Sequence, residues 1–420
     1  MIPSTDDDCF CASPSLMTVE EALALLERTL SVAVGVETLS LTAASGRVLA
    51  RDVVSSLNLP PHDNSAMDGY GVFLDDLHPD TQTRLPVTGR VPAGGVLGRK
   101  ARRGEAIRIF TGAAIPEGID TVLMQEDCQD LGDGQVLLPS WKKRGANCRR
   151  AGEDVAAGAV AVLAGSRLRA QEIGLIAAVG QSEISVYRPL RVALFSTGDE
   201  LREPGHPLTP GCIHDANRYS VRVLLEGLGC AVTDLGILPD RLPVVSQALK
   251  DATPGHDLIL TSGGVSTGEE DHVKNAVESL GTLHFWRLAI KPGKPLAMGH
   301  VAGVPFVGLP GNPVAAMVTF LILGRAVVAR LSGRTPVRLR PYSMRAGFST
   351  TRAAGRREFL RARVLPGEDG LPTAVPFPTQ SSAVLSSLVH SEVLIDLGEC
   401  LTSVKEGDMV PVLSLAELAW

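Results

Sequence analysis

The sequence has few aromatic residues and no surplus of positive charge. Only 4% of its 420 residues are Phe, Trp or Tyr, and the formal net charge is −6. Nucleic-acid-binding proteins usually combine a basic surface with aromatic side chains on which bases stack, so we expect no nucleic-acid partner. Apolar residues make up 45% of the chain, which is enough for substantial cores. A chain of this length suggests about three structural units.

Paired cysteines and long apolar runs are also lacking. The seven cysteines are an odd number and form no C-x-x-C or zinc-like spacing, which is typical of reduced thiols in a cytoplasmic protein. The longest apolar stretch, residues 314–324, is about half as long as a membrane crossing requires. We therefore expect a buried helix there and no membrane association. Residues 6–8 are three aspartates, and no apolar core of a signal peptide surrounds them.

The spacing of apolar residues changes along the chain and indicates separate structural regions. Thr18 and Glu21 form a capping-box pattern that predicts a helix over residues 18–30. Turn signals recur between short β-rich runs over residues 70–140, which is typical of a small all-β domain. Over residues 190–332, strand-like runs alternate with helical patterns, which predicts a doubly wound parallel sheet with helices on both faces. Beyond this region the helical pattern ends, and short strands predict a second small β domain.

Three strand-like runs of the α/β region end in turns that are rich in glycine and small polar residues. In a doubly wound sheet ligands bind at the C-terminal ends of the strands, so we expect these turns to lie together at one edge. Exposed backbone N–H groups and the N-terminus of a following helix favour an anion there. Asn312 and Pro313 suit the N-cap and the first position of such a helix. The three turns are Ser196–Glu200, Ser262–Gly268 and Pro310–Pro313.

Carboxylates next to these turns indicate a metal site. If Glu200 and Asp271 face each other from neighbouring strand ends, the two carboxylates suit a magnesium ion that bridges to a phosphate. Glu269 and Glu270 are interpreted instead as solvated charges that complement the dipole of the following helix.

Cations in the same region predict an anion-holding role. Arg287 and Lys291 would share one face of a strand because side chains alternate with a period of two, and the turn that follows would present Lys294. Solubilising surface charges are the alternative interpretation, but two phosphate-binding turns nearby favour an anion. A further basic run over residues 142–150 could form a nucleic-acid patch, but the overall acidic balance and the nearby Glu153 and Asp154 weaken that interpretation.

Eight motifs, taken together and in this order, resemble the molybdopterin molybdenumtransferase family, to which the gephyrin E domain is related. The resemblance covers essentially the whole chain beyond residue 15. The motifs are DNSAMDGY (63–70), TGA (111–113), RAGED (150–154), FSTGDEL (195–201), DANR (215–218), TSGGVSTGEED (261–271), AIKPGKP (289–295) and GLPGNP (308–313).

This resemblance implies a late step in the synthesis of the molybdenum cofactor. Enzymes of the family take adenylylated molybdopterin and molybdate as substrates and cleave the adenylyl bond with Mg²⁺. The products are the molybdenum cofactor and AMP. The resemblance also implies an elongated homodimer that exchanges the pterin with other proteins of cofactor biosynthesis in the cytoplasm. The implied domains are an elongated N-terminal region (15–60 and 145–185), an inserted small β domain (61–144), a molybdopterin-binding α/β domain (186–332) and a C-terminal β domain (333–420).

The family's site residues carry over to matching positions of this sequence. The residues implied at the reaction centre are Asp68, Thr111, Asp154, Glu200, Asp240 and Asp271, with Glu200 and Asp271 as metal ligands. The residues implied to bind substrate are Ser262, Gly263, Gly264, Ser266, Arg287, Lys291, Lys294, Pro310, Gly311, Asn312, Arg361 and Ser382.

Departures from the family pattern and alternative functions remain open at this point. His214 and His272 stand where tyrosine is usual, and Arg287 stands where lysine is common, although the two cations differ in geometry. A gephyrin-like scaffold that binds a partner without turnover is the main alternative, and the intact acid set favours the enzyme. A nucleotide pyrophosphatase built on the α/β region alone would not explain the match in the flanking regions. Tungstate in place of molybdate stays open.

Overall fold

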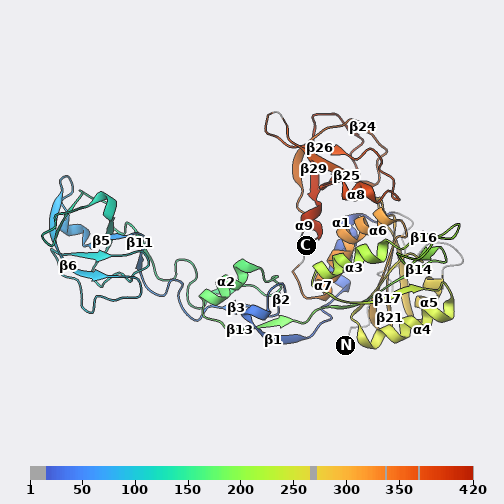
Figure 1. Cartoon of the computed structure of the whole chain (residues 1–420), viewed down its shortest axis with the longest axis horizontal. Helices are drawn as coiled ribbons and strands as arrows, with labels where there is room; N and C mark the ends of the chain where they lie inside the picture. Colours follow the sequence, from blue (N-terminus) through green and yellow to red (C-terminus); the bar gives the residue numbers. More distant parts are fainter. Residues whose placement is uncertain (1–15, 265–271, 336–337, 368, 420) are drawn as a thin grey trace. The chain divides into compact units, whose positions relative to one another are not determined.

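The computed structural model describes residues 16–264, 272–335, 338–367 and 369–419, and these form two compact units (Figure 1). The larger unit contains the described parts of residues 1–37, 46–50 and 185–420, and the smaller unit contains residues 38–45 and 51–184. An α/β region and a barrel-like sheet make up the larger unit, whereas the smaller unit is mainly β. The four-domain boundaries implied by the resemblance stay a prediction.

A six-stranded sheet forms the α/β region of the larger unit. Four strands run parallel in the order β17-β14-β18-β22, and β21 and β19 continue the sheet with antiparallel pairing. The predicted parallel sheet is thus confirmed, and its antiparallel edge is an addition that the alternating pattern did not indicate. The strands are β14 (Arg191–Thr197), β17 (Ala231–Leu238), β18 (Leu258–Ser262), β19 (Gly281–Arg287), β21 (Pro295–Val301) and β22 (Val304–Leu309), beside a short pair of β15 (Leu201–Arg202) and β16 (Ile213–His214).

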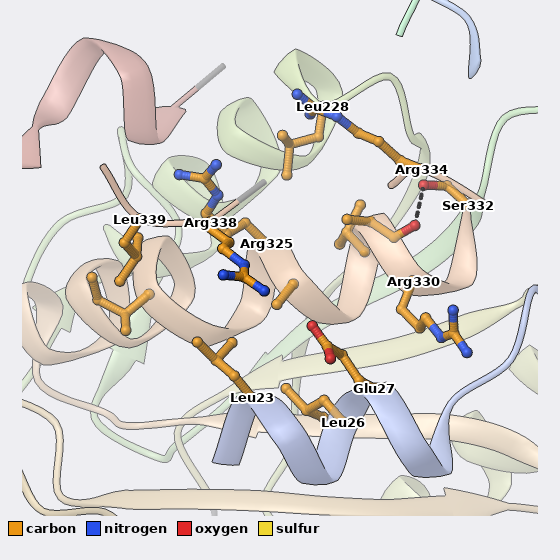
Figure 2. A pocket seen from close by; sticks show the side chains of 14 residues that line it. Leu23, Leu26, Glu27, Leu228, Arg325, Arg330, Ser332, Arg334, Arg338 and Leu339 are labelled. Carbon is orange, nitrogen blue, oxygen red and sulfur yellow. Dashed lines mark hydrogen bonds between the residues drawn. The ribbon is translucent and has the colours of Figure 1, made fainter. Parts of the chain in front are cut away.

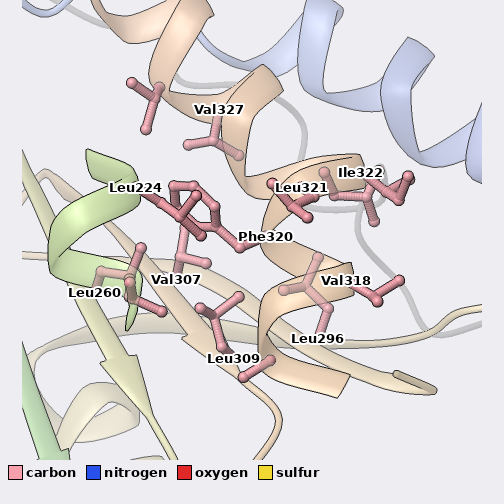
Figure 3. Close-up of a cluster of buried hydrophobic side chains, with 14 of the residues drawn as sticks. Leu224, Leu260, Leu296, Val307, Leu309, Val318, Phe320, Leu321, Ile322 and Val327 are labelled. Atoms are coloured by element: carbon pink, nitrogen blue, oxygen red, sulfur yellow. The ribbon is translucent and has the colours of Figure 1, made fainter. Parts of the chain in front are cut away.

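Helices cover both faces of this sheet because alternate residues of its central strands are apolar in both directions. Leu194 and Leu260 pack in one cluster with α1, α3 and the segment α6–α7, part of which Figure 3 shows. Phe195 and Ile259 point to the opposite face and pack against α4 and α5. The helices are α1 (Val19–Thr29), α3 (Asn217–Gly227), α4 (Leu242–Ala252), the 3₁₀ turn η5 (Thr253–Gly255), α5 (His272–Leu280), α6 (Pro313–Thr319), the π-helical turn η6 (Phe320–Gly324) and α7 (Arg325–Leu331).

Two helix predictions are confirmed in detail. The Thr18 hydroxyl accepts a hydrogen bond from the Glu21 N–H at 3.2 Å, and the Glu21 carboxylate accepts one from the Thr18 N–H at 2.8 Å, so the capping box is formed. The continuous helical segment Pro313–Leu331 is long and apolar enough to cross a membrane, but 78% of its most apolar window is buried inside the structure. It is a core helix of the larger unit, as the sequence predicts for residues 314–324.

The C-terminal part of the larger unit is a barrel-like sheet. β25 pairs with both β26 and β27, and β23 and β29 complete the ring around a core that includes Ala346, Ile395 and Val412. β20 adds to β25 in parallel, with Lys291 opposite Glu358, and so joins the barrel to the α/β region. The elements are β20 (Ile290–Lys291), β23 (Tyr342–Ala346), β24 (Thr350–Thr351), β25 (Arg357–Leu365), β26 (Thr373–Pro376), α8 (Ser386–Val389), β27 (Val393–Leu397), β28 (Ser403–Val404), β29 (Met409–Ser414) and α9 (Leu415–Ala419).

The smaller unit is built around a second six-stranded sheet, in the order β8-β5-β7-β6-β10-β9, as the recurring turn signals predict. Apolar side chains fill both sides of it, with Leu123 and Val136 in one cluster and Ile107 and Ile109 in the other. The strands of this sheet are β5 (Gly69–Val72), β6 (Thr83–Val91), β7 (Ala106–Ile109), β8 (Thr121–Met124), β9 (Gln129–Asp130) and β10 (Gln135–Leu138).

Short elements flank the smaller unit's sheet or connect it to the rest of the chain. β4 pairs with β11, β3 pairs with β12, and β2 pairs with β13, each pair antiparallel. These elements are β1 (Val36–Ser40), η2 (Leu41–Ala43), β2 (Val48–Leu49), β3 (Val53–Val54), β4 (Asn64–Ser65), η3 (Leu74–Asp76), η4 (Gln125–Asp127), β11 (Cys148–Arg149), β12 (Val160–Val162), α2 (Ala170–Ala178) and β13 (Glu183–Tyr187).

Candidate active site

The turns after β14, β18 and β22 lie at one edge of the α/β sheet. Strand register places Ser196 beside Ser262, and Ser262 beside Leu309. Asn217, at the start of α3, links two of the turns, because its side-chain amide donates to the Ser262 hydroxyl at 2.8 Å and to the Gly311 carbonyl at 2.7 Å. The structure therefore brings the glycine-rich turns together at the C-terminal ends of parallel strands, where ligands of this sheet class bind.

Glycine is required at two of these positions by packing as well as by conformation. Gly264 has a φ of +63°, and a Cβ built on it would lie 2.4 Å from Thr197 Cγ2 and 2.7 Å from a methyl group of Val273. Gly263 has a φ of +88°, and its Cβ would lie 3.1 Å from the Thr197 carbonyl oxygen. Both glycines let the turn pack closely against the end of β14. Packing therefore requires glycine at these positions, in addition to any requirement that a ligand approach the backbone.

The structure describes some of the acids at this edge of the sheet. Asp240 follows β17, and its buried Oδ1 has no hydrogen-bond partner among the described residues. Glu200 follows β14 and is exposed, with its carboxylate folded over Gly198. Asp271 and Ser266, as well as the two helix-start glutamates before Asp271, lie outside the described residues. In the part of the chain that the structure describes, no three His, Cys, Asp or Glu side chains gather as a metal site.

A cationic pocket lies between the α/β edge and the barrel. It has a volume of about 510 Å³, which is large enough for a nucleotide-sized ligand. Three cations, Lys291, Lys294 and Arg356, line it, and none of its described lining residues is a carboxylate. The pocket thus brings together six residues implied to bind substrate, namely Lys291, Lys294, Pro310, Gly311, Asn312 and Ser382. Asn312 occupies the N-cap position of α6, although its side chain makes no capping hydrogen bond.

A second cavity of the larger unit lies along α1 and α7 and serves as a contrast (Figure 2). Its volume is only about 70 Å³, and it contains none of the residues implied by the resemblance. Its lining includes four leucines and four arginines, and its small volume suits a single side chain better than a nucleotide.

The expectation for Arg287 and Lys291 is wrong in one respect, because they do not share a strand. β19 ends at Arg287, and the next two residues leave the sheet: the Ala289 N–H donates to the Met17 carbonyl at 2.7 Å, and the Ala289 carbonyl accepts from the Arg357 N–H at 2.7 Å. Lys291 then belongs to β20 and faces the pocket, whereas the exposed Arg287 does not line it. Contacts with distant segments produce this break.

Arg361 does not reach the pocket either. Its side chain is 1% exposed, and its guanidinium donates to the Ser387 hydroxyl at 3.1 Å and to the Ser381 carbonyl at 3.0 Å. Burial lowers the pKa of Arg361. Two further hydrogen bonds, at 3.0 and 2.9 Å, join its backbone to the Gln380 side chain. Arg361 therefore supports the loop that carries Ser382 and does not line the pocket, and its role in binding substrate stays a prediction.

Arg356 is the pocket arginine that the sequence interpretation missed. It immediately precedes β25 and is exposed in the pocket. The sequence contains a signal that Arg361 does not face the pocket. The two-residue period of a strand places Arg361 on the same face as Phe359, a large apolar residue that is fully buried in the structure. Arg356 lies outside that alternation.

Within the smaller unit, two of the three implied site residues are in contact. The Asp68 carboxylate accepts hydrogen bonds from the Thr111 N–H at 2.8 Å and from the Thr111 hydroxyl at 2.7 Å. These bonds, the backbone one first, and the nearby Arg108 hold the pKa of Asp68 below its ordinary value. Asp154 is exposed in another turn, where its N–H donates to the Leu59 carbonyl at 3.0 Å.

Two motifs of the smaller unit also meet. The Asp63 carboxylate accepts a hydrogen bond from the Ala151 N–H at 2.9 Å and from the Arg150 guanidinium at 2.5 Å. The same contacts lower the pKa of Asp63. The turn that contains Asp154 is therefore fixed to the segment that leads to Asp68.

The fold and the pocket define a multidomain protein with a molybdopterin-binding type of α/β region. Three family models match the chain in order: the MoeA N-terminal region (domain I and II) over residues 17–180, the probable molybdopterin binding domain over 193–330, and the MoeA C-terminal region (domain IV) over 343–415.

Relatives extend this similarity over nearly the full length. The chain is 40% identical to a molybdopterin molybdenumtransferase of Haemophilus influenzae, covering 94% of this chain and 98% of that one. It is 36% identical to molybdopterin molybdenumtransferase 2 of Mycobacterium tuberculosis, covering 90% and 95%. A solved molybdopterin biosynthesis MoeA protein from Pyrococcus horikosii is 30% identical, with a TM-score of 0.72 and coverage of 95% and 99%. The chain belongs to the molybdopterin molybdenumtransferase family, which confirms the resemblance seen in its motifs.

Proposed function

We propose that this protein inserts molybdenum from molybdate into adenylylated molybdopterin, with cleavage of the adenylyl bond and release of molybdenum cofactor and AMP. The observation that carries the proposal is the pocket in which Lys291, Lys294 and Arg356 face the glycine-rich edge of the sheet. Molybdate is a dianion and the adenylyl group carries a phosphate, so both need cations and backbone donors rather than carboxylates.

The cations and the turns have separable roles in this proposal. Lys291, Lys294 and Arg356 hold the oxyanion by charge, and Arg356 adds the planar fork that suits two oxygens at once. The turn after β22 lines the same pocket and places backbone groups next to the oxyanion. Cleavage of the adenylyl bond requires mainly that the reacting groups be positioned and that charge on the phosphate be neutralised. A rigid sheet edge with fixed hydrogen-bond donors suits this reaction.

Two acids that follow β17 and β14, at the C-terminal edge of the α/β sheet, fit a magnesium ion. Carboxylate oxygens are the ligands that Mg²⁺ prefers, and the Asp240 Oδ1 is a buried acceptor with no protein partner among the described residues. Asp240 and the exposed Glu200 would hold the ion, together with Asp271 as the resemblance implies. Bound there, the ion supplies neutralisation of the charge that develops on the phosphate oxygens.

We further propose a homodimer that acts in the cytoplasm and exchanges the pterin with other proteins of cofactor biosynthesis. The support is the family resemblance, which also implies Asp68, Thr111 and Asp154 at the reaction centre. In this arrangement Thr111 keeps Asp68 ionised and oriented. Light scattering of the purified protein tests the dimer directly.

Release of AMP tests the proposed reaction. Purified protein with adenylylated molybdopterin, Mg²⁺ and molybdate should release AMP, and omission of either inorganic component should reduce the release. Asp271→Asn and Lys294→Met should each abolish most of it. Lys250→Met removes an exposed lysine of α4, outside the pocket, and is the matched control that should keep wild-type release. Replacing molybdate by tungstate in the same assay measures the preference for the metal.

The gephyrin-like scaffold is the alternative that this assay separates. A scaffold would bind adenylylated molybdopterin and yet release no AMP under any of these conditions. The relatives that match nearly the full chain are named as transferases, which favours turnover.

A further inference from the structure

Lys291 lies between two cavities of the larger unit. One is the cationic pocket described above, and the other, of about 440 Å³, is lined by Thr350, Arg352 and Glu358 among others and shares Lys291 and Arg356 with the first. Strand pairing explains this position, because β20 and β25 run parallel with Lys291 directly opposite Glu358. Backbone hydrogen bonding therefore places Glu358 one strand away from the pocket's lysine.

The ion pair between these two residues is loose on the lysine side. The Lys291 Nζ lies 3.3 Å from Glu358 Oε2, whereas charge-assisted hydrogen bonds are commonly about 2.7–2.9 Å long. The Lys291 side chain is 49% exposed, so water and solutes reach its ammonium group. Lysine also has three N–H donors on a flexible chain, which allows it to turn toward a second acceptor.

Glu358 is more confined than the lysine. Its side chain is 13% exposed, and its Oε1 lies 3.3 Å from the Nε of Arg352, a contact between opposite charges without hydrogen-bond geometry; the Arg352 side chain is only 6% exposed. Arg352 is fixed in turn, since its guanidinium donates to the carbonyls of Gly398 at 2.8 Å and Leu401 at 2.6 Å, and to that of Arg356. The carboxylate is thus the more confined of the two groups, and the half-exposed lysine is the more mobile partner.

We propose that Glu358 is a positioning residue whose carboxylate competes with the bound oxyanion for Lys291. This inference rests on the proposed function in so far as the pocket's ligand is an oxyanion. Without ligand, Glu358 orients the lysine between the cavities. With ligand, its negative charge opposes the attraction between Lys291 and the anion, so it weakens binding and promotes release. A pocket with three cations and no counter-ion would retain a dianion more tightly than repeated turnover requires.

The proposal predicts a gain of affinity, which structural damage would not produce. Glu358→Gln keeps the shape of the side chain and removes the competing charge. Partly exposed ion pairs contribute modestly, so we expect molybdate to bind up to about fivefold more tightly to this variant. The gain should shrink as salt is added, because the competition is electrostatic. The apparent KM for molybdate should fall in parallel.

Titration calorimetry with sodium molybdate alone tests this with the wild type and four variants. Glu392→Gln is the matched control: Glu392 is an exposed glutamate just before β27, with no ion pair among the described residues. It should bind as the wild type does. Lys291→Met should bind more weakly, and the addition of Glu358→Gln to Lys291→Met should change nothing further, because the competition needs the lysine.

Each outcome has a distinct meaning. Unchanged or weaker binding by Glu358→Gln, or a gain that persists without Lys291, overturns the competition. If the wild type binds no molybdate, the proposed function itself fails, which is a different result. Should Glu358→Gln not fold, Glu358→Asp keeps the charge but shortens the side chain by one methylene, which withdraws the carboxylate from Lys291. This variant should show a smaller gain, and its absence overturns the inference as well.

Discussion

Replacing Gly264 by alanine should destabilise the larger unit and abolish turnover. The residue has a φ of +63°, and the added Cβ would lie 2.4 Å from Thr197 Cγ2 and 2.7 Å from Val273 Cγ2. The left-handed backbone costs an alanine about 1–2 kcal/mol. Crowding two well-packed side chains costs about 1–3 kcal/mol more. The total is about 2–5 kcal/mol, either as lost stability or as a displaced turn at the sheet edge.

Two other glycines separate the contributions. Gly303 has a φ of +85° with no atom within 4 Å of its Cβ position, so Gly303→Ala should lose only the backbone part, about 1–2 kcal/mol. Gly311 lies in the neighbouring turn, outside the left-handed region, and its Cβ would meet only the Gly263 Cα at 3.9 Å. Gly311→Ala should therefore be close to neutral for stability.

The assay is unfolding by urea or heat together with release of AMP. Midpoints are compared rather than absolute free energies, since a chain with two units need not unfold in one step. We expect the midpoint to fall most for Gly264→Ala, less for Gly303→Ala and least for Gly311→Ala. Wild-type midpoint and wild-type AMP release for Gly264→Ala would refute the packing described under the turn.

Three further predictions follow from individual contacts. Arg356→Met should weaken molybdate binding about tenfold or more, as expected for loss of a charged donor. If calorimetry shows the variant and the wild type binding molybdate equally well, Arg356 does not contribute to the site. Asn217→Leu should reduce AMP release with little change in the unfolding midpoint, because its amide joins two turns rather than a core; unaltered release contradicts this. Thr111→Val should raise the pKa of Asp68 toward its ordinary value without fully restoring it, because the backbone N–H, the larger cause, remains. Since the folded-state pKa of Asp68 is lowered, its ionised carboxylate stabilises the fold above the ordinary pKa, and this stabilisation is lost as pH falls. An NMR titration should therefore show Asp68 becoming protonated at higher pH in the variant than in the wild type. An identical titration curve would contradict the contact with the Thr111 hydroxyl.

Local features of this protein could be predicted from the sequence because their causes lie within a few residues. The capping box joins two residues that are three positions apart in the sequence. The buried strands are recognisable because the residues that point to either face of the sheet are apolar. The glycine-rich turns follow those strands directly. Parallel strand order then requires the turns to share an edge, so the position of the candidate site was predictable as well.

The tertiary structure decided which charged side chains face the pocket. Arg356 and Arg361 are five residues apart; the strand period groups Arg361 with Phe359, but the packing of β25 decides that this face is the buried one. The pairing of Lys291 with Glu358 joins residues from two different parts of the chain, and the separation of Arg287 from Lys291 depends on contacts with Met17 and Arg357. A sequence pattern reports the period of a strand, whereas the partner across the sheet is set by how distant segments pack, and that contact alone determines which charges meet.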